Sequence, residues 1–192
     1  MGRKSLAPRR REEILQAVEL CIRQRGLAGA SFARIAELAG VQPSLIAHYF
    51  GSRDGLLDAL VERVTARCRD AFADHVATHP EAGQVEAALD FLFGDVFVGD
   101  PVAAVVAHLV AEAGCEPAIR ARLRQMYAEF EETCRKAVDA SHPGAPTRRR
   151  VEMAYALMCL ADANARFASL DADSAREDHA RRAAETLLGS LP

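Results

Sequence analysis

Apolar residues recur at intervals of three and four along most of the 192-residue chain. This spacing is typical of helices that bury one face. In the first such segment, Ile14, Val18 and Cys21 repeat in this way. Sustained alternation of apolar and polar residues, which would indicate strands, is nearly absent. The pattern therefore predicts an all-α fold.

Glycine, proline and capping residues divide this pattern into about nine helices. The first is expected from about Pro8 to Arg25, with Gly26 just past its end. The others are expected at about 32–38, 43–49, 53–75, 81–97, 101–113, 116–140, 147–170 and 174–189. Three helices would form a small head and longer ones a body. We therefore expect an N-terminal domain of residues 1–52 and a second domain of residues 53–192.

Charge is distributed unevenly between these two parts. Residues 1–60 hold nine Lys or Arg against six Asp or Glu, whereas the remaining residues hold fifteen against twenty-one. Several of the basic residues precede or open the first helix, among them Arg3 and Lys4. A basic head on an acidic body favours a nucleic-acid-binding module joined to another domain.

Two short predicted helices at residues 31–50 have the spacing of a helix-turn-helix. Ser31 can cap the first, Gly40 tolerates the positive φ of a tight turn, and Pro43 suits the first turn of the second. The inner face is expected to comprise Ile35, Ala36, Val41, Leu45 and Phe50. The outward-facing set is expected to comprise Gln42, Pro43, Ser44, Ala47 and His48, at the end of the helix that enters the major groove.

This segment resembles the tetracycline-repressor (TetR) family of transcription regulators. The matching positions are Ile35-Ala36, Ala39-Gly40-Val41, His48-Tyr49-Phe50, Ser52-Arg53 and Leu56-Leu57. Their interlocked spacing over about 50 residues makes the resemblance specific. It implies a sequence-specific DNA-binding regulator, a homodimeric repressor that a small molecule releases from its operator.

The resemblance implies contacts to the DNA backbone from positions around the recognition helix. Ser31 and Arg34 would contact phosphates, and the hydroxyl of Tyr49 would donate a hydrogen bond to a further phosphate. Arg53, which replaces the usual Lys, would offer charge to the DNA backbone. Arg3 and Lys4 would reach DNA as a flexible arm. For Tyr49, a position in the protein core is the open alternative.

The outward-facing set would lie against the bases or the adjacent backbone, and it departs from the family pattern at two positions. Gln42 stands where Ser or Thr is usual, which weakens the helix cap but adds an amide able to read adenine. Ala47 stands where Tyr is frequent, which removes one DNA contact. The operator sequence therefore does not transfer from the family.

The last two predicted helices carry wide apolar faces. In the family this part of the chain forms a four-helix dimer interface, which implies a homodimer and a palindromic operator. The alternative is that these faces only cover the protein's own core. The residues concerned are Val151, Ala154, Tyr155, Met158, Cys159 and Ala161 on one helix, and Ala180, Ala183, Ala184, Leu187 and Leu188 on the other.

The resemblance also implies a small-molecule pocket in the body, for which polar groups within apolar helices are the candidates. The candidate ligand-binding residues are His108, Glu112, Tyr127, Met158 and Asp162. A surface pair of His108 with Glu112, or a bond from Asp162 to Arg166, is the alternative role. Residues 48–57 are similar to the choline–betaine pathway branch of the family. Choline itself is not expected, because the chain has no Trp for an aromatic cage.

Other functions find little support in the sequence. No nucleophile triad, carboxylate pair or metal-ligand spacing indicates an enzyme, a cofactor or a metal site, which leaves a helical enzyme or ligand carrier as the minor alternative. The five scattered cysteines are expected to be buried thiols in a reducing cytosol. The chain shows neither a signal peptide nor a membrane span, so we expect a protein of the bacterial cytoplasm.

Overall fold

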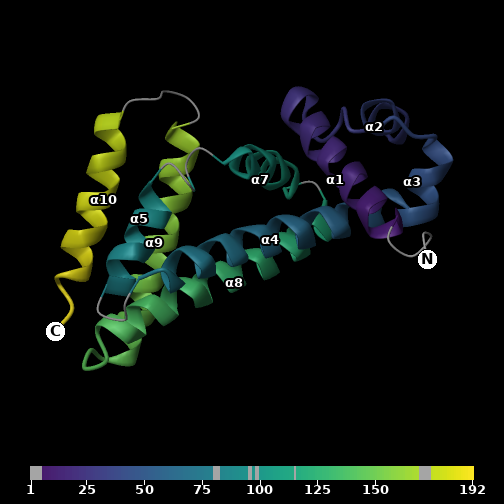
Figure 1. The fold of residues 1–192 in the computed structure, drawn as a ribbon. Helices are drawn as coiled ribbons and strands as arrows, with labels where there is room; N and C mark the ends of the chain where they lie inside the picture. The colour runs from purple at the N-terminus through teal and green to yellow at the C-terminus, as the bar shows by residue number, and fades with distance from the viewer. Residues whose placement is uncertain (1–5, 80–82, 95–96, 98–99, 115, 169–173) are drawn as a thin grey trace. The chain divides into compact units, whose positions relative to one another are not determined.

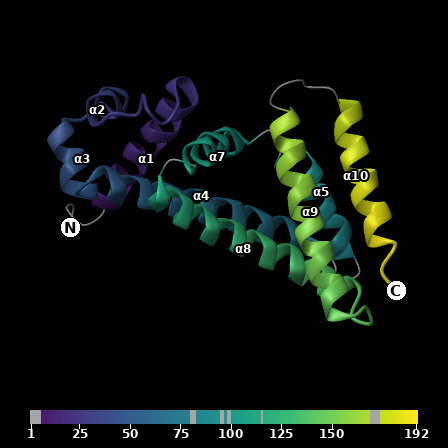
Figure 2. The same ribbon diagram turned by 180° about the vertical axis from the view of Figure 1, so that it is seen from behind.

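The computed structural model describes residues 6–79, 83–94, 97, 100–114, 116–168 and 174–192. Within these ranges the regular structure consists of nine long or medium α-helices (Figures 1 and 2), which confirms the predicted class. They are α1 (Leu6–Arg25), α2 (Phe32–Ala39), α3 (Pro43–Phe50), α4 (Arg53–Ala77), α5 (Gln84–Phe93), α7 (Pro101–Glu112), α8 (Pro117–Ser141), α9 (Thr147–Ala168) and α10 (Ser174–Leu188). The largest departure from prediction is α5, which is shorter than the expected 81–97.

The chain divides into two compact units. One consists of Met1–Thr65 and Ala104–Leu123, and the other of Ala66–Ala103 and Arg124–Pro192. The first unit contains the predicted helix-turn-helix together with a later segment of the chain. The functional boundary expected between residues 52 and 53 stays a prediction.

The first unit is built around the apolar stripe of α1. Ile14 and Ile22 of α1 are fully buried, as are Ile35 of α2, Ile46 of α3 and Leu60 of α4. These side chains come from four helices, because the apolar face of a helix can be buried only against other elements. The common core therefore fixes α2 and α3 against α1.

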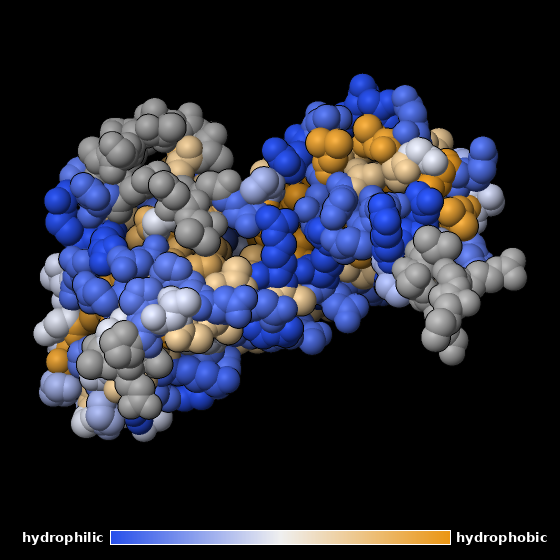
Figure 3. Space-filling view, in the orientation of Figure 1, coloured by the Kyte–Doolittle hydropathy of each residue, from blue (hydrophilic) through white to orange (hydrophobic). Residues whose placement is uncertain are grey.

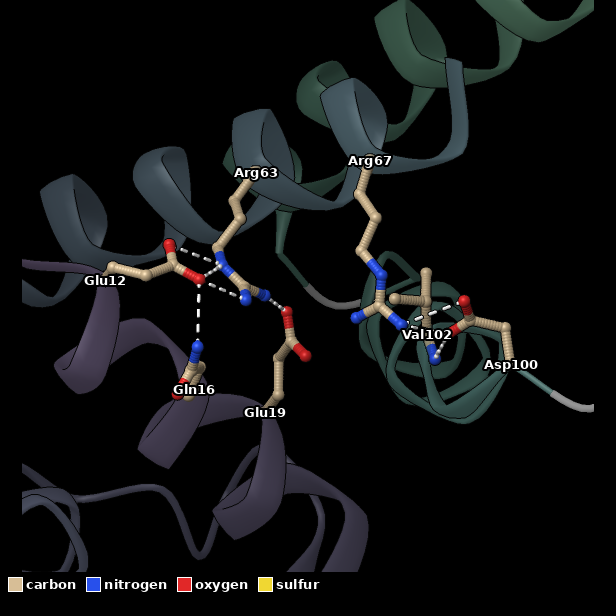
Figure 4. Close-up of polar contacts among 7 residues, drawn as sticks. All are labelled: Glu12, Gln16, Glu19, Arg63, Arg67, Asp100 and Val102. Atoms are coloured by element: carbon tan, nitrogen blue, oxygen red, sulfur yellow. Dashed lines mark hydrogen bonds and ion pairs between the residues drawn. The ribbon is translucent and has the colours of Figure 1, made fainter. Parts of the chain in front are cut away.

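A polar contact also joins α1 to the first half of α4. Arg63 donates to both carboxylate oxygens of Glu12 at 2.6 to 3.1 Å and pairs with Glu19 (Figure 4). Glu19 is only 8% exposed, so its charge needs a partner. The hydrogen bond from Arg63 to Glu12 is the main cause that raises the pKa of Arg63. This network holds the two helices in one register.

The second unit has its own core from α4, α5, α8, α9 and α10. Leu89 and Leu92 of α5 pack with Val138 of α8, Leu157 of α9 and Leu188 of α10 in one buried cluster. In Figures 1 and 2, α5, α9 and α10 run side by side. These three helices therefore form a closely packed group within the unit.

The start of α7 is held by a carboxylate. Asp100 accepts the backbone N–H of Val102 at 2.8 Å, which is the hydrogen bond of an N-terminal cap. Arg67 of α4 donates to both oxygens of the same carboxylate at 2.8 and 2.9 Å (Figure 4). One side chain thus caps α7 and binds it to α4.

The surface seen in Figure 3 is hydrophilic over most of its area and is broken by separate apolar patches. Among the residues that the structure describes, none of the helices combines the length and the apolar character needed to cross a membrane.

Cys21, Cys134 and Cys159 are free thiols in different surroundings. Cys21 and Cys134 are buried as expected, and burial raises the pKa of Cys134 to about 12. Cys159 on α9 is exposed, so the expectation of a buried thiol is wrong there. Its side of α9 faces away from the unit's core. Cys115 lies outside the described residues.

Candidate nucleic-acid interface

The predicted turn between the two short helices is present. The hydroxyl of Ser31 accepts the backbone N–H of Arg34 at 3.3 Å and so caps α2. Gly40 ends α2 with φ of +64°, in the left-handed region that favours glycine. The backbone N–H of Val41 then returns to the carbonyl oxygen of Ala36 at 2.9 Å. These contacts set the direction in which α3 leaves the turn.

Helix α3 packs on the first unit by a different residue from the one expected. Ile46 is fully buried and Phe50 is 8% exposed, whereas Leu45 and Val41 are only half-buried. Residues 46 and 50 lie about one helical turn apart, so they share the face that meets the core. The inner position therefore belongs to Ile46, and Leu45 flanks it.

The outward-facing set lies at the surface as predicted. All five of its members, Gln42, Pro43, Ser44, Ala47 and His48, are exposed. Gln42 occupies the N-cap of α3 but makes no side-chain cap bond, so its amide is available to a ligand. The polar groups among these five side chains lie on one end and one face of α3. Exposed hydrogen-bonding groups at one end of a helix are what the reading of base edges in a DNA groove requires.

The residues predicted to contact the DNA backbone differ in exposure and in their partners within the protein. Ser31 is exposed beside its cap, and Tyr49 is half-buried with its ring against those of His48 and Phe50. Arg34 is half-buried and pairs with Glu37 at 2.6 Å. Its charge is thus partly balanced within α2. Arg3 and Lys4 lie outside the described residues.

Arg53 has an intramolecular role that the sequence did not indicate. Its guanidinium donates to the carbonyl oxygens of Leu27 and Ala30, both at 3.1 Å. The side chain therefore ties the start of α4 to the turn that precedes α2. A contact from Arg53 to DNA stays a prediction, and it would have to compete with these two bonds.

Sequence reasoning missed two residues that shape this interface, Ile46 and Arg11. Arg11 of α1 donates to the backbone carbonyl of Tyr49, at the last turn of α3. A signal for it exists in the chain, because Arg11 lies three and seven residues before Ile14 and Val18. That spacing places it on the stripe assigned to the core.

Three of the predicted ligand-binding residues lie in the second unit. Tyr127 donates its hydroxyl to Asp162 at 2.8 Å, and Arg166 pairs with Asp162 as the alternative predicted. Burial, followed by the charge of Asp162, raises the pKa of Tyr127 to about 12. Met158 is 8% exposed and belongs to the buried core cluster. The structure thus joins Tyr127 and Asp162 directly.

The other two belong to the first unit. His108 and Glu112 of α7 are half-buried, and the ring of His108 faces the turn at Gly26 that ends α1. A Cβ at Gly26 would stand 3.7 Å from Nδ1 of His108. Neither unit therefore brings all five predicted ligand-binding residues together.

A small apolar crevice lies within the second unit. Its lining includes Phe72, Leu92, Val138 and Leu157, and none of the five predicted ligand-binding residues is part of it. With about 280 Å³ of space, open solvent included, it is at or below the lower limit of usual small-molecule pockets. In the described part of the chain no three His, Cys, Asp or Glu side chains gather as metal ligands.

The segment that contains the helix-turn-helix matches a known protein family. Residues 14–60 match the family of bacterial regulatory proteins described as the tetR family, and this range contains α2 and α3. Over 100 residues the chain is 36% identical to the HTH-type transcriptional regulator BetI of Stenotrophomonas maltophilia. That alignment spans half the length of each chain.

A second relative matches far more of the chain. It is the HTH-type transcriptional regulator BetI of Escherichia coli, 31% identical over 157 residues, which are 80% of this chain and 78% of the relative. The protein belongs to the tetR family. Its fold agrees with that of a transcriptional regulator from Saccharomonospora viridis solved in complex with choline, with a TM-score of 0.75 at 18% identity. That alignment covers 95% of this chain and 97% of the other. Membership indicates a transcriptional regulator rather than an enzyme.

Proposed function

We propose that this tetR-family member is a homodimeric repressor that binds a palindromic operator and leaves it when a small molecule binds the body. The observation that carries the proposal is the exposed face of α3, with Gln42, Ser44 and His48 at the end a groove would receive. The protein would act in the bacterial cytoplasm and would catalyse no reaction.

The DNA contacts divide by chemistry. Gln42 can bond both N6 and N7 of an adenine, and Ser44 and His48 can donate to or accept from base edges. Ala47 and Pro43 would lie against the groove without polar groups of their own. Ser31, Arg34, Tyr49, Arg53 and the arm at Arg3 and Lys4 would contact the DNA backbone, which positions α3 without selecting a sequence.

The dimer would form through α9 and α10. Val151, Tyr155 and Phe167 of α9 are 41%, 56% and 57% exposed, and Leu187 of α10 is 39% exposed. The first two lie four residues apart and Cys159 follows at the same spacing, which makes an exposed stripe along α9. A second copy with the same stripe would cover these residues.

Part of the apolar surface predicted for this interface has another role. Ala154, Met158 and Ala161 of α9, with Ala184 and Leu188 of α10, are buried in the second unit's own core. Each helix therefore presents two apolar faces, one inward and one outward. Only the outward face is proposed for the partner.

The effector would bind the body and change the spacing of the two heads. A ligand can release DNA only through its different affinity for the two states of the dimer. The hydrogen-bonded pair of Tyr127 and Asp162 offers a polar end beside the apolar core that contains Met158. His108 and Glu112 stay candidates. An amphipathic molecule fits these candidate residues better than choline. Choline would need an aromatic cage, and the chain has no Trp.

A footprint on the DNA upstream of the protein's own gene tests the proposal. Two protected segments centred about one helical turn, roughly 34–36 Å, apart on one face of the DNA are expected from a dimer. Removal of the α3 contacts in the double variant Gln42→Ala, Ser44→Ala should abolish both segments. A single protected segment, or protection spread evenly along the DNA fragment, would contradict the binding of a dimer to a palindromic operator.

A further inference from the structure

Arg11 reaches from α1 to the end of the recognition helix. Its guanidinium donates to the backbone carbonyl oxygen of Tyr49 at 3.1 Å. The same guanidinium lies 4.5 Å from the centre of the Phe50 ring, within the distance of a cation–π contact. One half-buried side chain therefore holds the last turn of α3 by its backbone and by its ring.

Helix α3 depends on such support because it is short. It has eight residues, and its N-cap residue Gln42 makes no side-chain bond. The carbonyls of the last turn of any helix have no partners within that helix, and they carry its negative partial charge. A cation at the carbonyl of Tyr49 supplies both a hydrogen bond and a favourable charge there.

The neighbouring arginines behave differently. Arg9 and Arg10 are exposed and pair with Glu13 on their own helix, at 3.0 and 2.8 Å. The basic run at the start of α1 therefore contains two surface arginines and one that is bound to α3. A run that the sequence presents as uniform charge has two distinct structural roles.

We propose that Arg11 is a positioning residue for operator recognition. It fixes the last turn of α3, and with it His48 and Tyr49, and it does not itself contact DNA. The effect of Arg11 on operator recognition rests on the proposed DNA-binding function. Its effect on the last turn of α3 can be measured without DNA.

The structural part is tested by amide hydrogen exchange on the full-length protein. In Arg11→Met, which keeps an apolar stem over Phe50, exchange at the amides of Phe50 and Gly51 should accelerate about tenfold, the effect of losing one hydrogen bond from a charged group. Arg10→Met removes the same charge one residue away and should leave these amides unchanged. The amides of α9 serve as an internal reference for global unfolding. Unchanged exchange at α3 in Arg11→Met would overturn the proposal.

The functional part is tested by the salt dependence of DNA affinity. Each phosphate contact contributes about 0.9 to the slope of log affinity against log salt. Arg11→Met should keep the slope of the unchanged protein and lose about tenfold in preference for operator over random DNA. Arg11→Lys keeps the charge but not the planar guanidinium, and it should recover little of this preference.

The opposite pattern would overturn the inference. It consists of a slope reduced by about one in Arg11→Met, an equal loss of affinity for all sequences, and full recovery in Arg11→Lys, as expected for a phosphate contact. Absence of DNA binding by the unchanged protein would be a failure of the proposed function instead. In that case the exchange measurement still decides whether Arg11 positions α3.

Discussion

Two glycines near α3 are required for different physical reasons. Gly40 has φ of +64°, and nothing lies within 4 Å of where its Cβ would be. Gly55 has no positive φ, but a Cβ there would stand 2.2 Å from the carbonyl oxygen of Phe50. Gly40 is required for its left-handed backbone conformation. Gly55 is required because a side chain there would collide with the end of α3.

Substitution by alanine should separate these two requirements. Gly40→Ala is expected to lower the free energy of unfolding by about 1 kcal/mol, the cost of a left-handed alanine. Gly55→Ala should cost more, because backbone atoms of Phe50 must move. Gly144, which has open space and no positive φ, is the control and should tolerate alanine. Urea unfolding measures all three, and equal losses at Gly40 and Gly55 would contradict this account.

The hydroxyl of Tyr127 should titrate at unusually high pH. Burial raises its pKa to about 12, so the neutral form is the one the folded state favours. Its contribution to stability is therefore complete below the ordinary tyrosine pKa of about 10 and is lost as the pH rises through 12. The absorbance difference between the unchanged protein and Tyr127→Phe isolates this group from the other two tyrosines. A difference that titrates near pH 10 would show a solvated Tyr127.

Gln42 and Tyr49 should differ in what they contribute to DNA binding. Gln42→Ala is expected to change which base is preferred at one operator position, at about 1–3 kcal/mol, because an amide reads adenine. Tyr49→Phe should weaken binding to all sequences alike, because a phosphate contact carries no sequence information. Selection of binding sites from random DNA compares them. A sequence-blind loss in Gln42→Ala would remove it from the base-reading set.

At the scale of helices, the ends could be predicted from sequence better than the packed faces. Ser31, Pro43 and Ser52 mark the starts of α2, α3 and α4, and Ser52 accepts the backbone N–H of Gly55 at 3.1 Å. Caps act on adjacent backbone, so they are visible in a local sequence. The inner position of Ile46 depends on where α1 lies, which no stretch of eight residues reveals.

The candidate sites follow the same division. The exposed set of α3 was predictable because it lies on one short helix. The bond between Tyr127 and Asp162 was not, since the two residues are 35 positions apart in the chain and lie on different helices. Arg11 belongs to the same class, because its partner Tyr49 is 38 residues away.

The exposed stripe of α9 lies at the centre of the proposed homodimer interface, which substitutions on this helix can test. Tyr155→Glu places a charge in the middle of the proposed interface and should convert the dimer to a monomer. Arg149→Glu introduces the same side chain at an exposed position of the same helix and should leave the dimer intact. Sedimentation equilibrium measures both. A dimer that survives Tyr155→Glu would place the interface elsewhere.

For the whole molecule, the distribution of charge supports one function for the head and another for the body. The basic excess lies in residues 1–60, whereas the rest of the chain is acidic overall. Attraction to DNA is therefore concentrated where α3 is, and the acidic body disfavours contact with the phosphate backbone. Such a molecule should bind DNA by its head and remain sensitive to salt.

Equilibrium binding to DNA from upstream of the protein's own gene, repeated at several salt concentrations, tests this claim most directly. The account predicts at least about 10³-fold preference for one upstream sequence over random DNA. It also predicts an affinity that falls steeply between about 50 and 200 mM salt, as phosphate contacts from two heads require. Equal affinity for random and upstream DNA, or an affinity that salt does not change, would contradict it.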